Sequence, residues 1–389
     1  MSITTPKGFV AAGLASGIKA SGALDLALLV TDDARAVPTA ATFTTNRAAA
    51  APVQVSRAHL AASGGAASAV VVSSGNANAA TGAPGRANAH RMCELVAQGL
   101  EVPDHQVLVC STGLIGYQLP MEPIEAGIPA LVAARSGSAQ AAEDAATGIL
   151  TTDSGRKQVL VSADGYTVAG MAKGAGMLAP NMATMLAFLT TDAAIEPGPL
   201  AELLRIAVRD SFNLMTVDGC TSTNDTVVLM ASGRAGQADP NVAVDHVTEA
   251  CADLATQMAA DAEGASKIAH VRVTGARSDG EAHRAARKVA ESLLVKCSFN
   301  GEDPYWGRVA SELGSAGVDF DMDRLTIAYG GVVVCRGGVS VGHDEAAVAE
   351  HLAGSMIDLH CELSLADGDG AAMTVDLGHG YIDENRTTS

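Results

Sequence analysis

Short apolar segments alternate with polar, glycine-rich turns along the whole chain, which predicts interleaved strands and helices. Apolar runs bounded by turn residues predict strands at 24–30, 39–44, 69–73, 107–110, 157–163, 166–171, 182–189, 227–231, 268–273, 294–299, 325–329, 332–335, 356–365 and 372–377. Apolar positions at helical spacing predict helices at 84–99, 121–135, 139–146, 198–210, 244–259, 282–294 and 345–353. The glycine- and proline-containing segment 233–240 predicts a loop. This alternation predicts an α/β protein with layered sheets and helices.

The least ordinary pattern lies in residues 173–192. The strands predicted at 157–163 and 166–171 form a hairpin that leads directly into it. A turn with two glycines and a proline then feeds the apolar run 182–189, whose one hydroxyl side chain is Thr184. The pattern predicts a turn followed by a buried strand.

Two interpretations of Thr184 compete. In the first it is a β-branched core residue whose hydroxyl bonds to a neighbouring carbonyl. In the second the peptide bond between Ala183 and Thr184 is cut, and the new α-amine serves as the base for the threonine's own hydroxyl. The local pattern alone favours the first interpretation.

Polar turns flank several of the predicted strands. Residues 74–78 and 111–113 each follow a short apolar strand, and the hydroxyl- and amide-rich segment 216–226 precedes another. On local pattern, 111–113 is most simply a plain turn. Four side chains are interpreted as holding turns rather than binding substrate: Asn76, Asn78, Asp218 and Asn224.

At 389 residues the chain exceeds what a single hydrophobic core usually supports, so two domains are expected. The clearest boundary is the segment 275–280, which predicts a larger domain over 1–275 and a smaller C-terminal α/β domain over 276–389. Hydrophobic residues make up 48% of the chain but aromatic residues only 3%, so the interior must be packed with small aliphatic side chains.

The formal net charge of −18 argues against nucleic acid or an anionic membrane as a partner, because either would be repelled. No apolar run reaches the ~20 residues of a membrane span, and the N-terminal sequence lacks a signal-peptide pattern. The seven cysteines form no Cys-x-x-Cys pair, which disfavours disulfide and zinc frameworks. A cytoplasmic protein with reduced thiols is expected.

Eight segments taken together resemble one family, the ornithine acetyltransferase family of arginine biosynthesis. They occur in order along essentially the whole chain, at 6–9, 43–47, 74–78, 111–113, 173–186, 218–225, 263–265 and 301–304. The resemblance implies a layered αββα-type sandwich like that of N-terminal-nucleophile aminopeptidases, with a smaller C-terminal domain. It turns the cleaved-threonine interpretation into the favoured one.

The implied protein cuts itself between Ala183 and Thr184 into chains 1–183 and 184–389, two of each forming a heterotetramer. The Thr184 hydroxyl would attack the preceding carbonyl in an N-to-O shift, and water would hydrolyse the resulting ester. The freed α-amine, with an ordinary pKa of about 7.7–8.0, would then act as a general base near neutral pH.

The resemblance also implies the roles of six further residues. The Thr112 hydroxyl and the Gly113 N–H would form the oxyanion hole, where one donor typically accounts for ~2.7–4 kcal/mol of barrier. Lys173 would bind an α-carboxylate and Glu263 an ammonium group. The tail would contact substrate through Asn385 and Ser389; because this tail is one residue shorter than the common form, Thr388 is an alternative to Ser389.

The implied reaction is ping-pong: N2-acetylornithine acylates Thr184, ornithine leaves, and glutamate takes the acetyl group. No metal or organic cofactor is implied. Acetyl-CoA is another donor in bifunctional relatives, although no phosphate-cradling glycine motif or basic cluster in this sequence supports it. A paralogue serving secondary metabolism, with a changed acceptor, would also fit the shortened tail.

Two alternatives remain. An amidohydrolase or aminopeptidase with an N-terminal nucleophile would use water in place of glutamate, so that acetate release would not depend on glutamate. A non-catalytic small-molecule binding protein would keep the fold and stay uncut.

Overall fold

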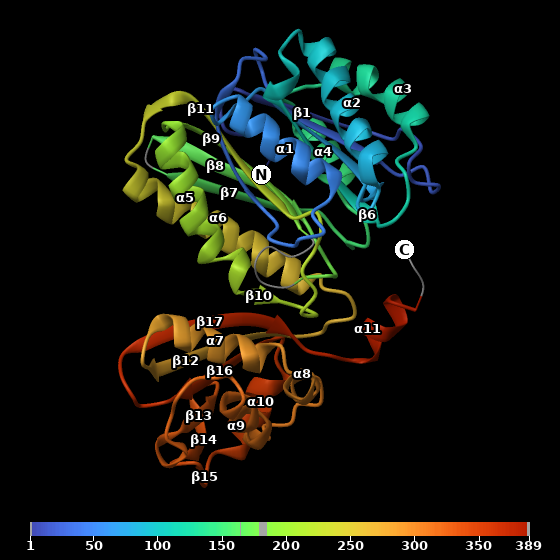
Figure 1. Cartoon of the computed structure of the whole chain (residues 1–389). Helices are drawn as coiled ribbons and strands as arrows, with labels where there is room; N and C mark the ends of the chain where they lie inside the picture. Colours follow the sequence, from blue (N-terminus) through green and yellow to red (C-terminus); the bar gives the residue numbers. More distant parts are fainter. Residues whose placement is uncertain (1, 164, 179–184, 387–389) are drawn as a thin grey trace. The chain divides into compact units, whose positions relative to one another are not determined.

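The computed structural model describes residues 2–163, 165–178 and 185–386. It divides into two compact units (Figure 1). The first comprises Met1–Asn213 and Cys220–Met258, and the second comprises Leu214–Gly219 and Ala259–Thr388. In the described part of the chain, no helix is both long and apolar enough to cross a membrane.

One sheet of the first unit has the strand order β1-β2-β5-β6. Its strands are β1 (Phe9–Leu14), β2 (Leu26–Thr31), β5 (Ala69–Asn76) and β6 (Val107–Leu114). β5 and β6 run parallel, and the other neighbours are antiparallel. β2 is buried along its whole length, because its apolar side chains meet a core on each face of the sheet.

The other sheet of this unit has the order β4-β3-β11-β9-β8-β7. Its strands are β3 (Val37–Phe43), β4 (Ala66–Ala67), β7 (Lys157–Ala163), β8 (Tyr166–Lys173), β9 (Leu186–Ala194) and β11 (Thr226–Gln237). β7 and β8 form the predicted hairpin, and β8 pairs antiparallel with β9. The β8–β9 pairing therefore places Lys173 opposite Leu186, the first residue of β9.

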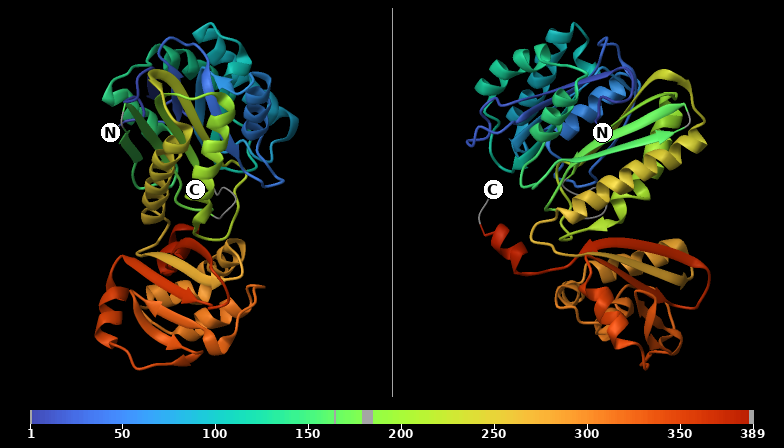
Figure 2. Two further views of the ribbon diagram at one scale, coloured as in Figure 1. Left: turned by 90° about the vertical axis from the view of Figure 1, so that its left-hand side faces the viewer. Right: turned by 180° about the vertical axis from the view of Figure 1, so that it is seen from behind.

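Helices cover the outer faces of the two stacked sheets. One set is α1 (Ala51–Ala62), α2 (Gly82–Leu100) and α3 (Met121–Ala133), which pack on the sheet that contains β6. The other is α5 (Pro197–Arg209) and α6 (Pro240–Ala260), which pack on the sheet that contains β9. Between the sheets, α4 (Ala139–Gly148) contributes alanines to a shared core. The predicted αββα layering is confirmed, and Figure 2 shows it from two further sides.

The second unit is built on a sheet with the order β10-β17-β12-β16-β13-β14-β15. Its strands are β10 (Met215–Thr216), β12 (Ile268–Ala276), β13 (Thr326–Tyr329), β14 (Val332–Arg336), β15 (Val339–Ser340), β16 (Met356–Glu362) and β17 (Gly368–Val375). Its helices are α7 (Asp279–Ala290), α8 (Leu293–Asn300), α9 (Trp306–Gly314), α10 (Glu345–Ala353) and α11 (His379–Glu384). Apolar side chains of α7 to α10 and of the sheet form one core. This unit is the expected smaller α/β part.

The sequence-based boundary at 275–280 falls inside the second unit. The structure divides the chain at Met258, and β12 pairs with β16 and β17 in the middle of that unit's sheet. The glycines of 275–280 mark the turn from β12 into α7 rather than a linker. Composition located a turn correctly, but strand pairing decides which unit it belongs to.

Two local predictions were wrong. The run 294–299, predicted as a strand, is part of helix α8, which begins where the Ser292 hydroxyl accepts a hydrogen bond from the Val295 N–H (3.4 Å). The predicted loop 233–240 is largely the end of β11, which crosses a bulge before Gly236 and pairs again with β9. The hydropathy pattern did not predict α1, β1, α9 or α11.

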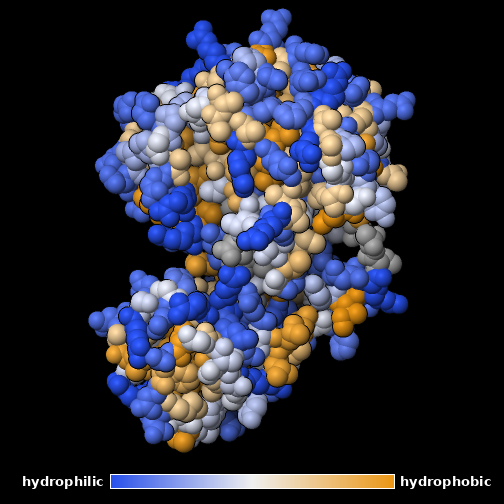
Figure 3. All heavy atoms as spheres, in the orientation of Figure 1, coloured by the Kyte–Doolittle hydropathy of each residue, from blue (hydrophilic) through white to orange (hydrophobic). Residues whose placement is uncertain are grey.

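Polar side chains dominate much of the face shown in Figure 3, with apolar ones between them. The cysteines are free thiols: Cys93, Cys110, Cys251, Cys335 and Cys361 are buried, and Cys220 and Cys297 are exposed. Burial raises the pKa of the Cys110 thiol to about 12, so this buried cysteine is an inert apolar residue rather than a nucleophile.

Candidate active site

Thr112 and Gly113 lie at the end of β6, beside the end of β5. The strands are in parallel register, with Thr112 opposite Ser74 and Gly113 opposite Gly75. Thr112 is buried, and Gly113 has φ +126°, where a Cβ would lie 2.6 Å from the Asn76 nitrogen. The segment predicted as a turn is therefore strand, and only glycine fits at position 113.

Asn224 ties the polar segment before β11 to these strand ends. Its side-chain amide donates to the carbonyls of Ala77 (2.6 Å) and Ser111 (2.8 Å). The Asn76 amide similarly donates to the carbonyls of Tyr117 and Gln118, at 3.2 and 3.1 Å. Both side chains thus hold backbone turns around the strand ends, as expected from the sequence.

Lys173, the last residue of β8, extends its ammonium group to the same place. Its Nζ donates to the Thr112 hydroxyl at 3.3 Å and to the Thr151 hydroxyl at 2.6 Å, and lies 3.7 Å from Asp153 Oδ2. The Lys173 side chain is 3% exposed. The structure therefore brings together Lys173 and Thr112, two residues singled out from the sequence.

Asp153 is a functional candidate that the sequence analysis missed. Its side chain is fully buried and accepts hydrogen bonds from Lys157 Nζ (2.7 Å) and from the Gly174 N–H (2.6 Å). Burial alone would raise the pKa of Asp153, but the ammonium groups of Lys173 and Lys157 and these hydrogen bonds lower it to about 2. A polar segment beside the predicted hairpin was the available signal.

Asp225 is a second buried carboxyl, in the residue directly before β11. Its Oδ1 accepts a hydrogen bond from the N–H of Met185 (3.0 Å), the residue after Thr184. The residue is 0% exposed, and within the described residues its Oδ2 has no hydrogen-bond partner. Burial raises the pKa of Asp225 well above its usual value, because the charged form is poorly solvated there.

This raised pKa gives a testable dependence of stability on pH. Between the unfolded pKa of about 3.9 and the raised folded value, the folded state holds a proton that the unfolded state has lost, so stability falls as pH rises. Asp225→Asn keeps the acceptor for Met185 and removes the charge. We expect it to raise the free energy of unfolding at pH 8 by on the order of 1–3 kcal/mol, measured by urea denaturation.

The gain from Asp225→Asn should shrink as the pH is lowered toward 4, because the wild-type carboxyl is then neutral as well. Asp153→Asn provides the opposite case, because the pKa of Asp153 is lowered and its stabilisation is lost only in acid. An Asp225→Asn gain of equal size at both pH values would contradict the buried, high-pKa assignment.

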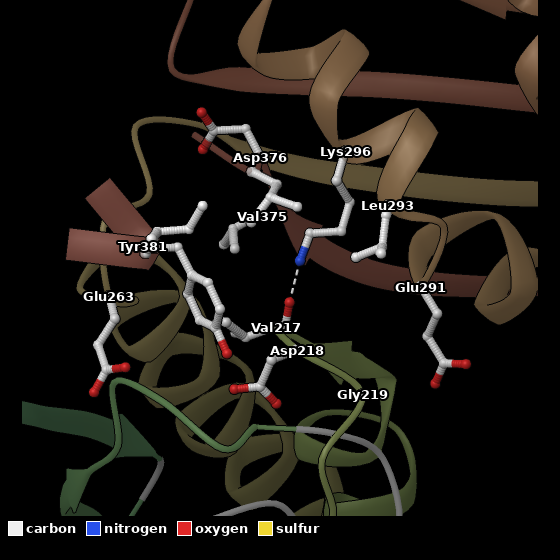
Figure 4. A pocket seen from close by; sticks show the side chains of 12 residues that line it. Val217, Asp218, Gly219, Glu263, Glu291, Leu293, Lys296, Val375, Asp376 and Tyr381 are labelled. Atoms are coloured by element: carbon white, nitrogen blue, oxygen red, sulfur yellow. Dashed lines mark hydrogen bonds between the residues drawn. The ribbon is translucent and has the colours of Figure 1, made fainter. Parts of the chain in front are cut away.

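In the second unit, Glu263 and Asn385 come together. The Asn385 side-chain amide donates to Glu263 Oε2 (2.9 Å) and to the Tyr381 carbonyl (2.9 Å). Glu263 and Tyr381 line a cavity of about 290 Å³, shown in Figure 4. The two residues that the family resemblance assigned to substrate in this unit are therefore in contact.

The charged groups in this cavity are mainly carboxylates. Asp218, Glu263, Glu291 and Asp376 line it together with one lysine, Lys296. The Lys296 ammonium donates to the Val217 carbonyl, and burial lowers the pKa of this lysine despite the neighbouring aspartates. An excess of carboxylates favours a cationic ligand.

Four residues assigned from the sequence lie outside the described residues: Ala183, Thr184, Thr388 and Ser389. Their roles stay predictions. In residues 2–163, 165–178 and 185–386, no group of three or more His, Cys, Asp or Glu side chains is arranged to hold a metal ion.

Comparison with known proteins gives matches over the whole chain. The ArgJ family model matches residues 10–387. The "Arginine biosynthesis bifunctional protein ArgJ" of Mycolicibacterium paratuberculosis is 46% identical over 397 residues, covering 100% of this chain and 96% of that protein. The protein of the same name from Thermobifida fusca is 45% identical and is covered over 100% of both lengths. A solved ornithine acetyltransferase of Mycobacterium tuberculosis, complexed with ornithine, is 45% identical with a TM-score of 0.44, over 46% of this chain and 94% of that one.

Proposed function

The chain belongs to the ArgJ family, and we propose that it transfers an acetyl group from N2-acetylornithine to glutamate in arginine biosynthesis. The observation that carries the proposal is the match to arginine-biosynthesis relatives along the full length of both chains. The contacts Lys173–Thr112 and Glu263–Asn385 support it, because each joins residues that the resemblance assigns to one site.

Self-cleavage comes first in the proposed mechanism. The Thr184 hydroxyl oxygen attacks the carbonyl carbon of Ala183, the carbon–nitrogen bond breaks, and an ester joins Ala183 to the threonine side chain. Water hydrolyses that ester, which leaves a carboxylate on Ala183 and a free α-amine on Thr184. The products are chains 1–183 and 184–389, which we propose to assemble as a heterotetramer in the cytoplasm.

Acetyl transfer then uses two groups of the new N-terminal residue, the α-amine as a base and the hydroxyl as the nucleophile. The α-amine of Thr184 takes the proton from its hydroxyl, which attacks the acetyl carbonyl of N2-acetylornithine. The Thr112 hydroxyl and the Gly113 N–H stabilise the oxyanion, and ornithine leaves with a proton on its nitrogen. The amine of glutamate attacks the acetyl ester, and its proton returns the threonine to its starting form.

The charges of the candidate sites suit an amino-acid substrate. Glu263, held by Asn385, is proposed to bind the side-chain ammonium of ornithine, and the carboxylate-rich cavity around it favours that charge. Lys173 supplies a cation for the substrate α-carboxylate. The tail residue Ser389, or Thr388 in its place, is proposed to add a hydroxyl contact.

The deciding experiment measures acetyl acceptors. We expect the purified protein, given N2-acetylornithine and glutamate, to form N-acetylglutamate and ornithine in equal amounts, at least tenfold faster than acetate appears without glutamate. The acceptor amine is held next to the acetyl ester, which raises its effective concentration, so transfer to the amine should outpace hydrolysis by water. Products are followed by mass spectrometry, with acetyl-CoA as donor in a parallel reaction.

Acetate formation at the same rate with and without glutamate would identify the amidohydrolase alternative and defeat the transferase proposal. A protein that stays uncut and releases no ornithine would instead fit the non-catalytic binding protein. Intact-mass measurement on the same sample distinguishes the two outcomes.

A further inference from the structure

The contact between Lys173 and Thr112 has a fixed direction. An ammonium group has hydrogens to donate and no lone pair to accept with, so the Thr112 oxygen must be the acceptor at 3.3 Å. In the described part of the chain the Thr112 side chain makes this hydrogen bond and no other. Its single hydroxyl hydrogen is therefore kept for a further acceptor.

Burial and neighbours restrict where the Lys173 ammonium can go. The Thr151 hydroxyl accepts from it at 2.6 Å, and Asp153 Oδ2 lies 3.7 Å away. The Asp153 carboxylate is itself fixed by the Gly174 N–H (2.6 Å) and by the Thr151 N–H (3.1 Å). Because Gly174 follows Lys173 directly, the Asp153 carboxylate contacts both the Lys173 side chain and the backbone that follows β8.

We propose that Lys173 and Asp153 set the donor of the oxyanion hole: Asp153 fixes the Lys173 ammonium, and the ammonium turns the Thr112 hydroxyl so that it donates its hydrogen to the oxyanion. This role is additional to carboxylate binding. Donation from a cation also polarises the hydroxyl, which makes its hydrogen a stronger donor. The inference rests on the proposed function, because it needs Thr112 to face the developing negative charge.

The two roles of Lys173 predict different kinetics. If Lys173 only binds the substrate carboxylate, its loss raises KM, and its effect multiplies with that of losing the Thr112 hydroxyl. If it acts through Thr112, its loss lowers kcat, and the two losses overlap. The structure favours the second outcome because the ammonium contacts Thr112 directly.

The test is a double-mutant cycle on the full chain, comparing wild type, Lys173→Met, Thr112→Val and the double variant. Each single change is expected to lower kcat per cleaved chain by ~10²–10³, the usual loss for one oxyanion donor. The double variant should be no more than about tenfold worse than the poorer single variant. Where a variant cuts itself too slowly to give enough cleaved chain for a kcat measurement, the cycle instead compares the rates of self-cleavage of all four proteins, followed by intact mass.

Asp153→Asn supplies an independent measurement, because it keeps the side-chain size and one acceptor oxygen. We expect kcat to fall by about tenfold to a hundredfold, with KM for N2-acetylornithine changed less than about threefold. Lys157→Met is the matched control: it removes the other lysine on Asp153 but leaves the Lys173–Thr112 contact, so its fall in kcat should be at least fivefold smaller than that of Asp153→Asn.

Losses that multiply in the double variant, or a raised KM with unchanged kcat in Lys173→Met, would overturn the inference. An equal loss in Lys157→Met and Asp153→Asn would also overturn it, since the cluster would then act only by holding the fold. These outcomes presuppose a wild type that cleaves itself and transfers acetyl. A wild type that does neither refutes the proposed function instead.

Discussion

Replacing Thr184 by alanine is expected to leave the chain as a single piece of 389 residues, whereas the wild type separates into 1–183 and 184–389. The variant loses the hydroxyl that is proposed to attack the Ala183 carbonyl and, with it, the oxygen that is proposed to carry the acetyl group. Acetyl transfer should fall by about 10⁴-fold or more, since removal of a nucleophile that acts as part of a unit typically costs that much. Intact-mass spectra of both proteins, recorded after the same storage time, provide the measurement.

Two matched variants separate loss of chemistry from loss of fold. Thr184→Ser keeps the hydroxyl but not the methyl that restricts χ1, so it should still cut and transfer, more slowly than the wild type. Thr190→Val removes a buried hydroxyl of β9 that donates to the Ile3 carbonyl (2.7 Å), and it should cut normally. A Thr184→Ala protein that still splits would exclude Thr184 as the nucleophile, and an uncut wild type that transfers acetyl would exclude cleavage as a requirement.

Hydropathy correctly predicted the elements whose buried residues recur at the regular spacing of a helix or a strand. Helix α5 was predicted to within one residue, because Leu200, Leu203 and Leu204 form a single apolar face. The β7–β8 hairpin followed from two apolar runs around a short turn. Both signals are local, so the sequence is sufficient.

The errors arose where a local apolar run meets a different environment. Leu294 was predicted to begin a strand, yet Leu293 and Leu294 are exposed on the first turn of α8, and the Ser292 cap decides the conformation. Helix α1 was missed because its buried face is built largely from alanine, proline and valine, and its hydropathy contrast is weak. Tertiary contacts, which no local window contains, fixed both segments.

Some residues of the candidate site could be predicted from the sequence, and one could be found only in the structure. Family motifs singled out Thr112, Lys173, Glu263 and Asn385, and the structure joins them in two contacts, each within one unit. Asp153 belongs to none of those motifs. Its importance comes from lying against Lys173 and Lys157, and that arrangement depends on how β8 and the segment before β7 pack.

The pKa values of two buried carboxyls of the first unit are shifted in opposite directions. Asp153 lies against two ammonium groups, which lower its pKa to about 2, so it is ionised at every physiological pH. For Asp225, burial outweighs the hydrogen bonds from Met185 and Ser222 and the charge of Lys173, so its pKa is raised well above its usual value. Titratable groups with pKa values shifted in opposite directions are typical of catalytic sites. Asp153 accepts a hydrogen bond from Gly174, the residue after Lys173, and Asp225 accepts one from Met185, the residue after Thr184.

Gly113→Ala is expected to damage both stability and activity. At φ +126° an alanine is strained by itself, and its Cβ would also lie 2.6 Å from the Asn76 nitrogen. Because the obstacle is backbone of the parallel strand β5, the ends of β5 and β6 must separate, and we expect a loss of about 4 kcal/mol or more in the free energy of unfolding. The same movement displaces the Thr112 hydroxyl and the Gly113 N–H, so both self-cleavage and transfer should fall by at least ~10²-fold.

Gly116→Ala is the control that isolates the close approach. Gly116 also has a positive φ, +91°, but a Cβ there meets nothing within 4 Å, so the substitution carries only the backbone cost of about 1–2 kcal/mol. Urea denaturation and intact-mass spectra of the two variants give the comparison. If Gly113→Ala were no less stable than Gly116→Ala and cut itself at the wild-type rate, the packing of the β5 and β6 ends would not be what holds Thr112 and Gly113 in place. A large difference between the variants in both stability and cleavage would mean that the closeness of these two strand ends positions the proposed oxyanion donors.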